Sequence, residues 1–521
     1  MKGAIAAGHA LTARAGARIL EEGGNAVDAC VAAGFAGWVA ESPLTGPGAG
    51  GFALVAPRDG PPRLADFFVA TPGLGRPELR GAEMHAIDVG FGGDSETTQV
   101  FRIGGASCAV PGTTAGLEAI HRAYGRLPWA EVVAPAVELA REGVELSRPQ
   151  AHLHAILDLI LRHTAEGRRL YSRPDGSRLQ PGDLLQLPDL GGTLEQIAVE
   201  GAAALYRGEL AASIAQTVEE GGGRLTVADL EAYEVIWREP VRVPYLGYEV
   251  ISNPPPSSGG ILIAYGLALL ERAGAGGRGS ADAIKALALV MREQTRVRDD
   301  AFAAGLYAGG LEEKLLSGEA LSAAAARIGE GDWPGEHAPA GGTTHVSAVD
   351  ADGNAASLSS STGSGSGVIV PGTGVQLNNM LGEYDLVAGA PAESGHRLTS
   401  MMAPTVVLSE GRPRLVVGSA GSVRLRGAIM QVIVNVLVHG DGVAEAIDAP
   451  RVHVEDAHVH CEGGFDAAAL DAVEEWSKNL VRWRRRNLYF GGTNAVEVLP
   501  DGDLAAAGDA RRGGDGVVVT T

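Results

Sequence analysis

The run TTHVSAVDADGNAASLSSS at residues 343–361 constrains the fold more than any other stretch of the sequence. Its residues alternate as in a hairpin of two strands, and Asp352-Gly353-Asn354 has the composition of the connecting turn. The segment 311–342 before it is acidic, rich in small residues and finally broken by Pro and Gly, which predicts a helix that runs into a mobile linker. A strand is therefore expected to begin at Thr343, directly after a flexible connection.

Helical periodicity dominates the part of the chain before this linker. Residues 9–24 carry apolar side chains three and four positions apart, and Gly23-Gly24 ends the pattern. The next stretch, 25–41, is mostly apolar and predicts a helix that is buried on most sides. Further helices are expected within 110–145 and from about 150 to 240.

Strand patterns become frequent in the later part of the chain. Strand pairs with Gly-containing turns are predicted within 241–252, 406–418 and 494–508. Early helices followed by late strands favour a layered α+β domain over alternating βαβ units. The length of 521 residues exceeds the usual limit of a single core, so we expect two or three domains or one large layered domain.

A glycine-rich loop at 43–51 matches the GxGxxG pattern with Gly46, Gly48 and Gly51. A dinucleotide fingerprint needs a strand before this loop and a helix after it. Here the order is reversed, helix then loop then strand, so we interpret the glycines as positions of close backbone packing.

The net charge of −21 and the pI of about 5.1 disfavour DNA, RNA and anionic lipid as partners, because these require a basic surface. No run of about 18 apolar residues predicts a membrane span. Residues 1–20 lack the pattern of a cleavable leader, so a cytoplasmic protein is expected.

The cysteines, Cys30, Cys108 and Cys461, are too few and too scattered for a disulfide framework and are predicted to be small buried residues. The sequence contains neither a CxxC pair nor an HExxH motif. We therefore expect no metal and no cofactor.

Thr343 is the most informative candidate for catalysis. A hydroxyl is a weak nucleophile at neutral pH and needs a base beside it. If the peptide bond before Thr343 is cut, the new α-amine, whose ordinary pKa is near 8, can act as that base without a histidine. One residue would then be nucleophile and general base.

The motifs around Thr343 resemble those of the γ-glutamyltransferase family. After Thr343 the chain contains GSGVIVPGTGVQLNN, LTSMMAPT, GSAGSVRL and GDARRGG, and before it GGNAVDA, GPGAGGF, VPGTTAGLEA, PDLGGTLEQIA and PPPSSGG. The resemblance covers almost the whole chain in the same order.

The resemblance implies an N-terminal-nucleophile hydrolase in which two sheets lie between two helical layers, a four-layer αββα fold. A precursor would cleave itself between Gly342 and Thr343 into segments 1–342 and 343–521, which stay together as a heterodimer or as a dimer of heterodimers. Thr343 would attack the γ-carbonyl of a small γ-glutamyl compound, form an acyl-enzyme and transfer the acyl group to water or an amine.

The resemblance also implies which residues assist the nucleophile. Ser360 or Ser361 matches the hydroxyl that supports it, and the motif alone does not choose between them. Gly421 and Ser422 match the pair whose backbone N–H groups form an oxyanion hole. The family usually has glycine at the second position, and serine there keeps the N–H but restricts the backbone.

For the zwitterionic γ-glutamyl head group, the family pattern implies an acceptor for the ammonium and donors for the carboxylate. Glu383 matches the acidic residue that binds the α-amine. Thr399 and Ser400 match the hydroxyl pair near the α-carboxylate.

Three positions depart from the family pattern. Phe68 stands where the family has an arginine for the α-carboxylate, Thr362 where it has an asparagine, and Met380 where it has a glutamine or glutamate. Loss of a bidentate arginine removes a contact worth roughly 1.5–3 kcal/mol. An arginine from elsewhere in the fold is a possible replacement; the candidates are Arg63, Arg397 and Arg424.

These departures leave the substrate open. The leading hypothesis is cleavage of a γ-glutamyl amide, the second is an acylase for a glutaryl-like amide, and the third is a non-catalytic relative. A dyad of Thr343 with His345 is disfavoured, and a packing or hydrogen-bonding role for His345 is expected.

Overall fold

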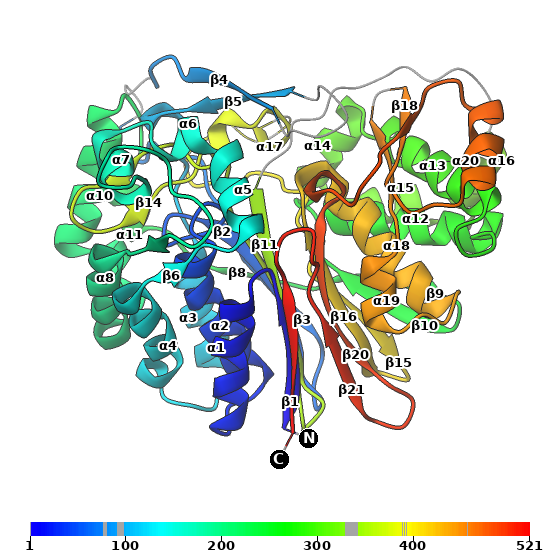
Figure 1. Cartoon of the computed structure of the whole chain (residues 1–521), viewed down its shortest axis with the longest axis horizontal. Coiled ribbons are helices and arrows are strands. Elements are labelled where there is room, and N and C mark those ends of the chain that lie inside the picture. Colours follow the sequence, from blue (N-terminus) through cyan, green and yellow to red (C-terminus); the bar gives the residue numbers. More distant parts are fainter. Residues whose placement is uncertain are drawn as a thin grey trace.

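Two antiparallel sheets lie face to face in the centre of the molecule (Figure 1). The computed structural model describes residues 2–76, 81–90, 98–328, 342–387, 389, 391, 393–455 and 457–520. The seven-stranded sheet has the order β22 (Asp515–Val519), β1 (Gly3–Ala7), β11 (Gly342–Asp350), β12 (Ala355–Gly363), β2 (Gly50–Ala56), β3 (Arg63–Phe67) and β8 (Ile236–Arg238). The six-stranded sheet has the order β21 (Leu504–Ala507), β20 (Gly492–Val498), β16 (Arg412–Ala420), β15 (Thr405–Ser409), β10 (Tyr248–Ser252) and β9 (Val241–Tyr245).

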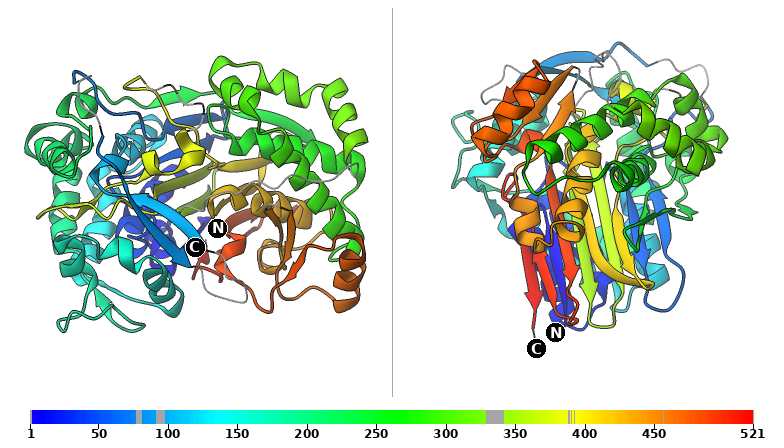
Figure 2. Two further views of the ribbon diagram at one scale, coloured as in Figure 1. Left: turned by 90° about the horizontal axis from the view of Figure 1, so that it is seen from above. Right: turned by 90° about the vertical axis from the view of Figure 1, so that its right-hand side faces the viewer.

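Helices cover the outer face of each sheet, as the view from above and the side view also show (Figure 2). On the seven-stranded sheet lie α1 (Ala10–Glu21), α2 (Ala26–Ala40) and α3 (Thr113–Tyr124), with α4 (Trp129–Glu142) and α8 (Pro188–Glu200) outside them. On the six-stranded sheet lie α12 (Gly259–Ala273) and α18 (Leu425–Leu437), with α13 (Ala281–Arg296) packed on α12. The predicted α+β class and the αββα layering are confirmed.

The remaining elements surround this sandwich. The other helices are α5 (Arg148–Ile156), α6 (Asp158–Leu161), α7 (Ala165–Tyr171), α9 (Ala203–Tyr206), α10 (Gly208–Glu220), α11 (Val227–Glu231), α14 (Asp300–Ala308), α15 (Leu311–Leu316), α16 (Gly318–Arg327), α17 (Tyr384–Val387), α19 (Val443–Asp448) and α20 (Ala467–Trp476). The small sheets pair β4 (His85–Gly90) with β5 (Thr98–Ile103), β6 (Val144–Glu145) with β7 (Leu184–Leu185), β13 (Ile369–Val370) with β14 (Val375–Gln376), and β17 (Val452–Glu455) with β18 (His458–Cys461) and β19 (Leu480–Arg482).

Helix α2 is buried along its whole length, as its apolar composition predicts. A capping box starts it: the Asn25 side chain accepts from the N–H of Asp28, and the Asp28 carboxylate accepts from the N–H of Asn25 at 2.9 Å. The sheet strands β11 and β12 lie on one side of α2 and the helices α1 and α4 on others. This apolar helix therefore supports the strands that carry Thr343.

The predicted hairpin at residues 343–361 forms the middle of the seven-stranded sheet as β11 and β12. In its turn, Asp350 Oδ1 accepts from the backbone N–H groups of Asp352 and Asn354 at 3.0 and 2.9 Å. The predicted linker before Thr343 falls largely on residues 329–341, which lie outside the described residues. Strand β11 pairs with β1 on one side and β12 pairs with β2 on the other, so the two segments of the chain share one sheet.

The glycine-rich loop follows α2 and precedes β2, in the order that excludes a dinucleotide fingerprint. A methyl group built on Gly48 would lie 2.2 Å from the carbonyl oxygen of Gln376, and one on Gly51 would lie 2.3 Å from that of Ser359. Close backbone packing is confirmed at both positions. The three cysteines are buried and unpaired, as predicted. Among the described residues, no helix combines the length and hydrophobicity of a membrane span.

Candidate active site

Thr343 is the second residue of β11 and is buried, with 4% of its surface exposed. The pairing of β11 with β12 is irregular here: Gly342 faces Gly363 and Thr344 faces Ser360, so the register shifts by one residue around Thr343. Such an irregularity re-aims the side chain at the end of a strand. The predicted nucleophile thus sits at a distorted strand end in the middle of the sheet.

The two serines that the motif leaves open have different surroundings. The Ser361 hydroxyl donates to the carbonyl oxygen of Gly342, the acyl side of the predicted cut, and accepts from the N–H of Gly363 at 2.8 Å. The Ser360 hydroxyl instead contacts the hydroxyl of Thr45 at 2.7 Å. Of the two, Ser361 contacts the peptide bond that joins Gly342 to Thr343.

The turn after β16 contains Gly421 and Ser422, the predicted oxyanion pair. Gly421 has φ +124° and Ser422 has φ +54°, so a serine occupies the left-handed region. A residue other than glycine pays roughly 1–2 kcal/mol in this region. Such strain is concentrated at functional sites. Ser422 therefore keeps a backbone conformation that glycine would adopt freely, and its N–H is preserved.

Glu383 is brought to the end of β12, next to the strand that bears Thr343. A methyl group on Gly363, whose φ is +71°, would lie 2.6 Å from Glu383 Oε1 and 2.1 Å from Asn379 Oδ1. Asn379 fixes this loop, because its side chain accepts from the N–H of Ser364 at 2.9 Å and donates to the Ser364 hydroxyl at 2.8 Å. Glu383 is 8% exposed.

Thr399 and Ser400 are bound to the proline-rich loop before α12. The Thr399 hydroxyl donates to the carbonyl of Pro256 at 2.6 Å. The Ser400 hydroxyl accepts from the N–H of Met402 at 3.1 Å, and the Ser400 carbonyl accepts from the hydroxyls of Ser257 and Ser258. Both side chains hold the backbone of this region in place.

The three positions that depart from the family pattern are all buried. Phe68 stacks on Phe52 with ring centroids 5.4 Å apart, and Met380 belongs to the same core cluster. The Thr362 hydroxyl is buried and has no hydrogen-bond partner among the described residues. Phe68 and Met380 are thus core side chains at two positions that are polar in the family pattern.

The three arginines considered as a replacement are placed by other side chains of the fold. Arg397 is buried, with Nε 3.4 Å from Asp66 and its guanidinium 4.4 Å from the ring centroid of Tyr233. Arg63 and Arg424 stack over the rings of Trp237 and Tyr489, respectively. Each of the three therefore has a contact of its own in the fold.

His345 packs between the sheets, which confirms the expected structural role. Its Nδ1 lies 2.8 Å from the Ser359 hydroxyl and its Nε2 lies 2.9 Å from the Ser347 hydroxyl. Complete burial lowers the pKa of His345 to about 3, so the ring is neutral at physiological pH.

Sequence reasoning missed Glu41, a carboxylate directly behind β11. Thr344 donates to Glu41 Oε2 at 2.5 Å, and Thr12 donates to Glu41 Oε1 at 2.9 Å. Burial raises the pKa of Glu41, while these hydroxyls and the nearby Arg512 oppose the rise. The only sequence signal was a charge at the C-terminal end of a mostly apolar helix.

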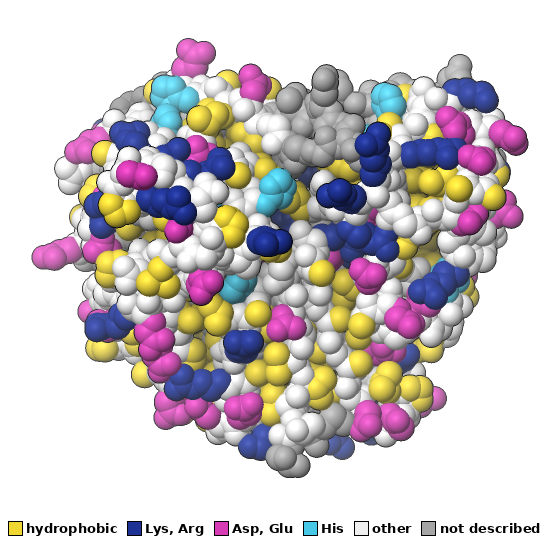
Figure 3. All heavy atoms as spheres, in the orientation of Figure 1, with side chains coloured by type: hydrophobic (Ala, Val, Ile, Leu, Met, Phe, Trp, Pro, Cys, Tyr) yellow, Lys and Arg dark blue, Asp and Glu magenta, His cyan; other side chains and the backbone are white. Residues whose placement is uncertain are grey.

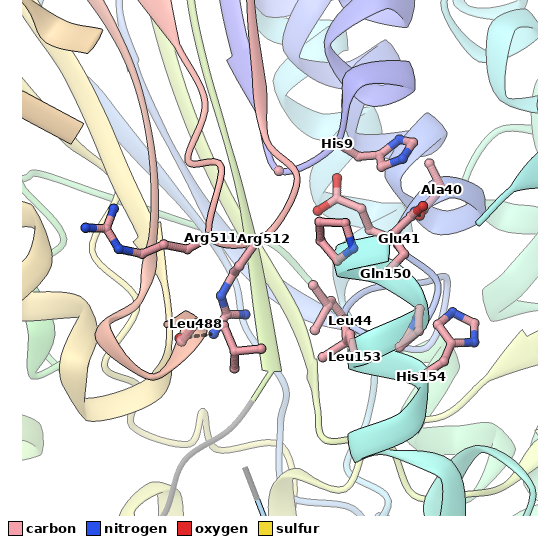
Figure 4. Close-up of a pocket in the computed structure, with 13 residues that line it drawn as sticks. His9, Ala40, Glu41, Leu44, Gln150, Leu153, His154, Leu488, Arg511 and Arg512 are labelled. Atoms are coloured by element: carbon pink, nitrogen blue, oxygen red, sulfur yellow. Dashed lines mark hydrogen bonds between the residues drawn. The ribbon is translucent and has the colours of Figure 1, made fainter. Parts of the chain in front are cut away.

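Glu41 lines a pocket beside the start of β11 (Figure 4). Leu44, also in its wall, would lie 2.9 Å from a methyl group on Gly342. The pocket therefore adjoins the predicted cleavage point. Its lining comprises Gly8, His9, Ala40, Glu41, Pro43, Leu44, Pro149, Gln150, Leu153, His154, Leu488, Arg511 and Arg512.

The αββα sandwich and its likeness to a solved acylase define a self-processing hydrolase of the N-terminal-nucleophile class. The gamma-glutamyltranspeptidase family model matches residues 12–519, and the chain belongs to this family. It is therefore an enzyme of the γ-glutamyltransferase and amidohydrolase type.

Relatives of two kinds are similar to the chain. It is 32% identical to the glutathione hydrolase proenzyme of Escherichia coli (strain K12), over 98% of this chain and 90% of that protein. It is 34% identical to the acylase ACY 1 proenzyme of Pseudomonas sp. (strain SE83), over 100% and 94%. The solved cephalosporin acylase from Bacillus halodurans matches with a TM-score of 0.83 and 25% identity over 100% of this chain and 96% of that one. The proenzyme names fit a chain that is processed into two associated pieces.

Proposed function

We propose that the chain cuts itself between Gly342 and Thr343 and then cleaves a γ-glutamyl amide with Thr343 as the nucleophile. The observation that carries the proposal is the Ser361 hydroxyl on the Gly342 carbonyl, beside a buried threonine at a distorted strand end. A donor on this carbonyl favours negative charge on its oxygen, and such charge develops when the Thr343 hydroxyl attacks the carbonyl carbon.

The proposed self-cleavage proceeds in two steps. The Thr343 oxygen bonds to the Gly342 carbon, the Gly342–Thr343 C–N bond breaks, and the hydroxyl proton passes to the released amine. Water then hydrolyses the ester, which leaves a carboxylate on Gly342 and a free hydroxyl and α-amine on Thr343. The new amine is the base that Thr343 needs in later turnovers.

Catalysis repeats this chemistry on the substrate. The α-amine takes the hydroxyl proton as the Thr343 oxygen attacks the acyl carbonyl, and the N–H groups of Gly421 and Ser422 bind the oxyanion. The proton then leaves with the amine product, and water or a second amine takes the acyl group. Glu383, at the end of β12, binds the α-ammonium of the γ-glutamyl group, while Thr399 and Ser400 position its α-carboxylate.

A second candidate is an acylase for a glutaryl-like amide, which has no α-amine. The buried Phe68 and Met380 favour it, because both stand at family positions that are usually polar. Similarity to an acylase proenzyme and to a solved acylase supports this second candidate, and similarity to a glutathione hydrolase proenzyme supports the first.

Intact-mass spectrometry of the purified protein tests the common part of both candidates. We expect two pieces ending at Gly342 and starting at Thr343, and a single uncut chain for Thr343→Ala. A Thr343→Ala protein that is still cut and still active would refute the role of Thr343. The ratio of activity on γ-glutamyl-p-nitroanilide to that on glutaryl-p-nitroanilide separates the candidates.

A further inference from the structure

The predicted oxyanion turn after β16 contains a hydrogen bond that fixes the direction of one of its donors. Gly421 and Ser422 share one peptide group, whose carbonyl belongs to Gly421 and whose N–H belongs to Ser422. A planar trans peptide points its carbonyl and its N–H in opposite directions. The Gly421 carbonyl accepts from the N–H of Arg424 at 3.1 Å, at the end of the 3₁₀-helix η3 (Ser422–Arg424). The position of Arg424 therefore determines where the Ser422 N–H points.

The turn is strained, so it needs support from the residues packed around it. Ser422 has φ +54°, and a residue other than glycine keeps such a backbone where its surroundings impose it. One neighbour is the 3₁₀-helix η4 (Leu488–Phe490), with Gly491 after it. A methyl group on Gly421 would lie 3.0 Å from Gly491 Cα, and one on Gly491 would lie 3.0 Å from the carbonyl oxygen of Ala420. The turn and this segment thus pack backbone against backbone.

Arg424 is a buried cation at this contact. On the face of the molecule shown in Figure 3, basic side chains gather on the upper middle part, although the chain carries a net charge of −21. Arg424 contributes little to any such surface, because it is 3% exposed. A buried charge needs compensating contacts within the fold. Its guanidinium carbon lies 4.5 Å from the ring centroid of Tyr489 in η4, a cation–π contact that supplies part of this compensation.

Tyr489 is held both by its hydroxyl and by its ring. The hydroxyl donates to Glu455 Oε2 at the end of β17. The ring stacks on Trp483 with centroids 4.9 Å apart and meets Phe490 edge-on at 5.2 Å. Burial and the charge of Glu455 raise the pKa of the completely buried Tyr489, while the charge of Arg424 opposes the rise. The hydroxyl therefore stays protonated and keeps donating to Glu455.

We propose that Tyr489 and Glu455 position the oxyanion turn through Arg424. Glu455 fixes the hydroxyl of Tyr489, and the Tyr489 ring holds the Arg424 guanidinium. The Arg424 N–H in turn holds the Gly421 carbonyl, so the Ser422 N–H keeps its direction toward a developing oxyanion. Tyr489 and Glu455 act through Arg424 and are positioning residues. This inference rests on the proposed function, because it takes the turn as the oxyanion hole of turnover.

The two proposed reactions depend on this turn to different extents. In self-cleavage the Gly342 carbonyl already accepts from the Ser361 hydroxyl. In turnover the oxyanion of the substrate relies on the N–H groups of Gly421 and Ser422. A displaced turn should therefore slow turnover and leave self-cleavage close to its wild-type rate, whereas a general loss of the fold would impair both.

Variants of Tyr489 test the inference through two readouts. The first is the rate of self-cleavage from intact mass, and the second is kcat and KM on γ-glutamyl-p-nitroanilide or glutaryl-p-nitroanilide, whichever is cleaved. Tyr489→Leu, which removes the ring beside Arg424, should lower kcat about 10- to 100-fold and change KM by less than about threefold, with self-cleavage within about twofold of wild type. Tyr489→Phe keeps the ring, so its kcat should lie between those of Tyr489→Leu and wild type.

The same two changes at Tyr265 are the matched controls. Tyr265 is 1% exposed and its hydroxyl donates to Glu293 at 2.9 Å, so each control removes a buried tyrosine–glutamate contact in another part of the fold. Wild-type kcat in Tyr489→Leu would overturn the inference. An equal fall of kcat in Tyr265→Leu, or self-cleavage slowed as much as turnover in Tyr489→Leu, would overturn it as well.

Hydrogen exchange separates this inference from the proposed function and needs no turnover. Glu455 is half-buried, so its replacement is less of a risk to the fold than that of Tyr489. In Glu455→Ala the N–H of Arg424 should exchange about tenfold faster than in wild type, while the amides of β11 keep their rates. Glu455→Gln retains an acceptor and should stay closer to wild type.

Unchanged exchange at Arg424 in Glu455→Ala would overturn the inference even if Thr343 is the nucleophile. Faster exchange at Arg424 in a protein whose wild type cleaves neither anilide would support the anchoring of the turn and refute the proposed reaction.

Discussion

Replacing Ser361 by alanine removes the hydroxyl that donates to the carbonyl of Gly342. The Gly342 oxygen gains negative charge as the Thr343 hydroxyl attacks, so this donor is worth more in the transition state than in the ground state. Loss of one such donor costs roughly 2.7–4 kcal/mol, a 10²- to 10³-fold lower rate. We therefore expect Ser361→Ala to slow self-cleavage by about this factor and to accumulate the uncut chain.

The assay is a time course of intact mass on freshly purified protein, with the fraction of uncut chain fitted to one rate constant. Ser360→Ala is the matched control, because it removes a neighbouring buried hydroxyl that contacts Thr45 instead. Ser361→Thr retains a hydroxyl and should cleave faster than Ser361→Ala. Thermal unfolding of each variant checks for loss of the fold. Cleavage of Ser361→Ala at the rate of Ser360→Ala would refute the reasoning.

Three further perturbations follow from the geometry. Gly363→Ala places a methyl group 2.6 Å from Glu383 Oε1, so it should raise KM for a γ-glutamyl substrate and lower stability by roughly 1–3 kcal/mol. Gly372→Ala is the control, because Gly372 has the same φ of +71° and its methyl group would have no atom within 4 Å, so only the backbone strain should remain. Equal effects of the two variants on KM would contradict this reasoning. The pKa of Glu41 is raised in the folded state, so its contribution to stability is present at low pH and is lost as pH rises through the raised pKa. The Tm of wild type minus the Tm of Glu41→Gln should therefore fall as pH rises from about 4 to 8. A constant difference in Tm would argue against a raised pKa. Ser422→Gly keeps the backbone N–H of the predicted oxyanion turn and removes left-handed strain, so kcat should be retained. A loss of kcat of about tenfold or more would argue against a role of this position through its backbone N–H alone.

The helices and hairpins were predictable because their signals are local. Periodicity with a glycine stop indicated α1, a mostly apolar stretch indicated α2, and alternation around an Asp-Gly turn indicated the hairpin of β11 and β12. Strand β1 was not predicted: its sequence, GAIAA, has little intrinsic strand preference. It is a strand because β11 and β22, both distant in sequence, pair with its two edges. Non-local pairing of this kind leaves no pattern in the five residues themselves.

The same division applies to the site. Motifs indicated Thr343, the pair Ser360 and Ser361, and Glu383, and the fold brings them to neighbouring strand ends, although their catalytic and binding roles stay predictions. The choice of Ser361 over Ser360 required the direction of each hydroxyl, which sequence spacing does not give. The contact of Arg424 with Tyr489 could not be predicted either, because the two residues lie in separate segments that meet in the fold.

The shared seven-stranded sheet gives a cut at Gly342 a consequence for the lifetime of the enzyme. Strand β11 pairs with β1 and β12 pairs with β2, so strands of the two proposed pieces are neighbours in one sheet. The two pieces cannot separate without breaking these backbone hydrogen bonds. Before the cut these pairings close loops within one chain, at an entropic cost that grows slowly with loop length. After the cut they must form between two molecules, and refolding depends on protein concentration. With the proposed cut, the chain would fold once, as the precursor, and the lifetime of the cut enzyme would be set by its unfolding barrier.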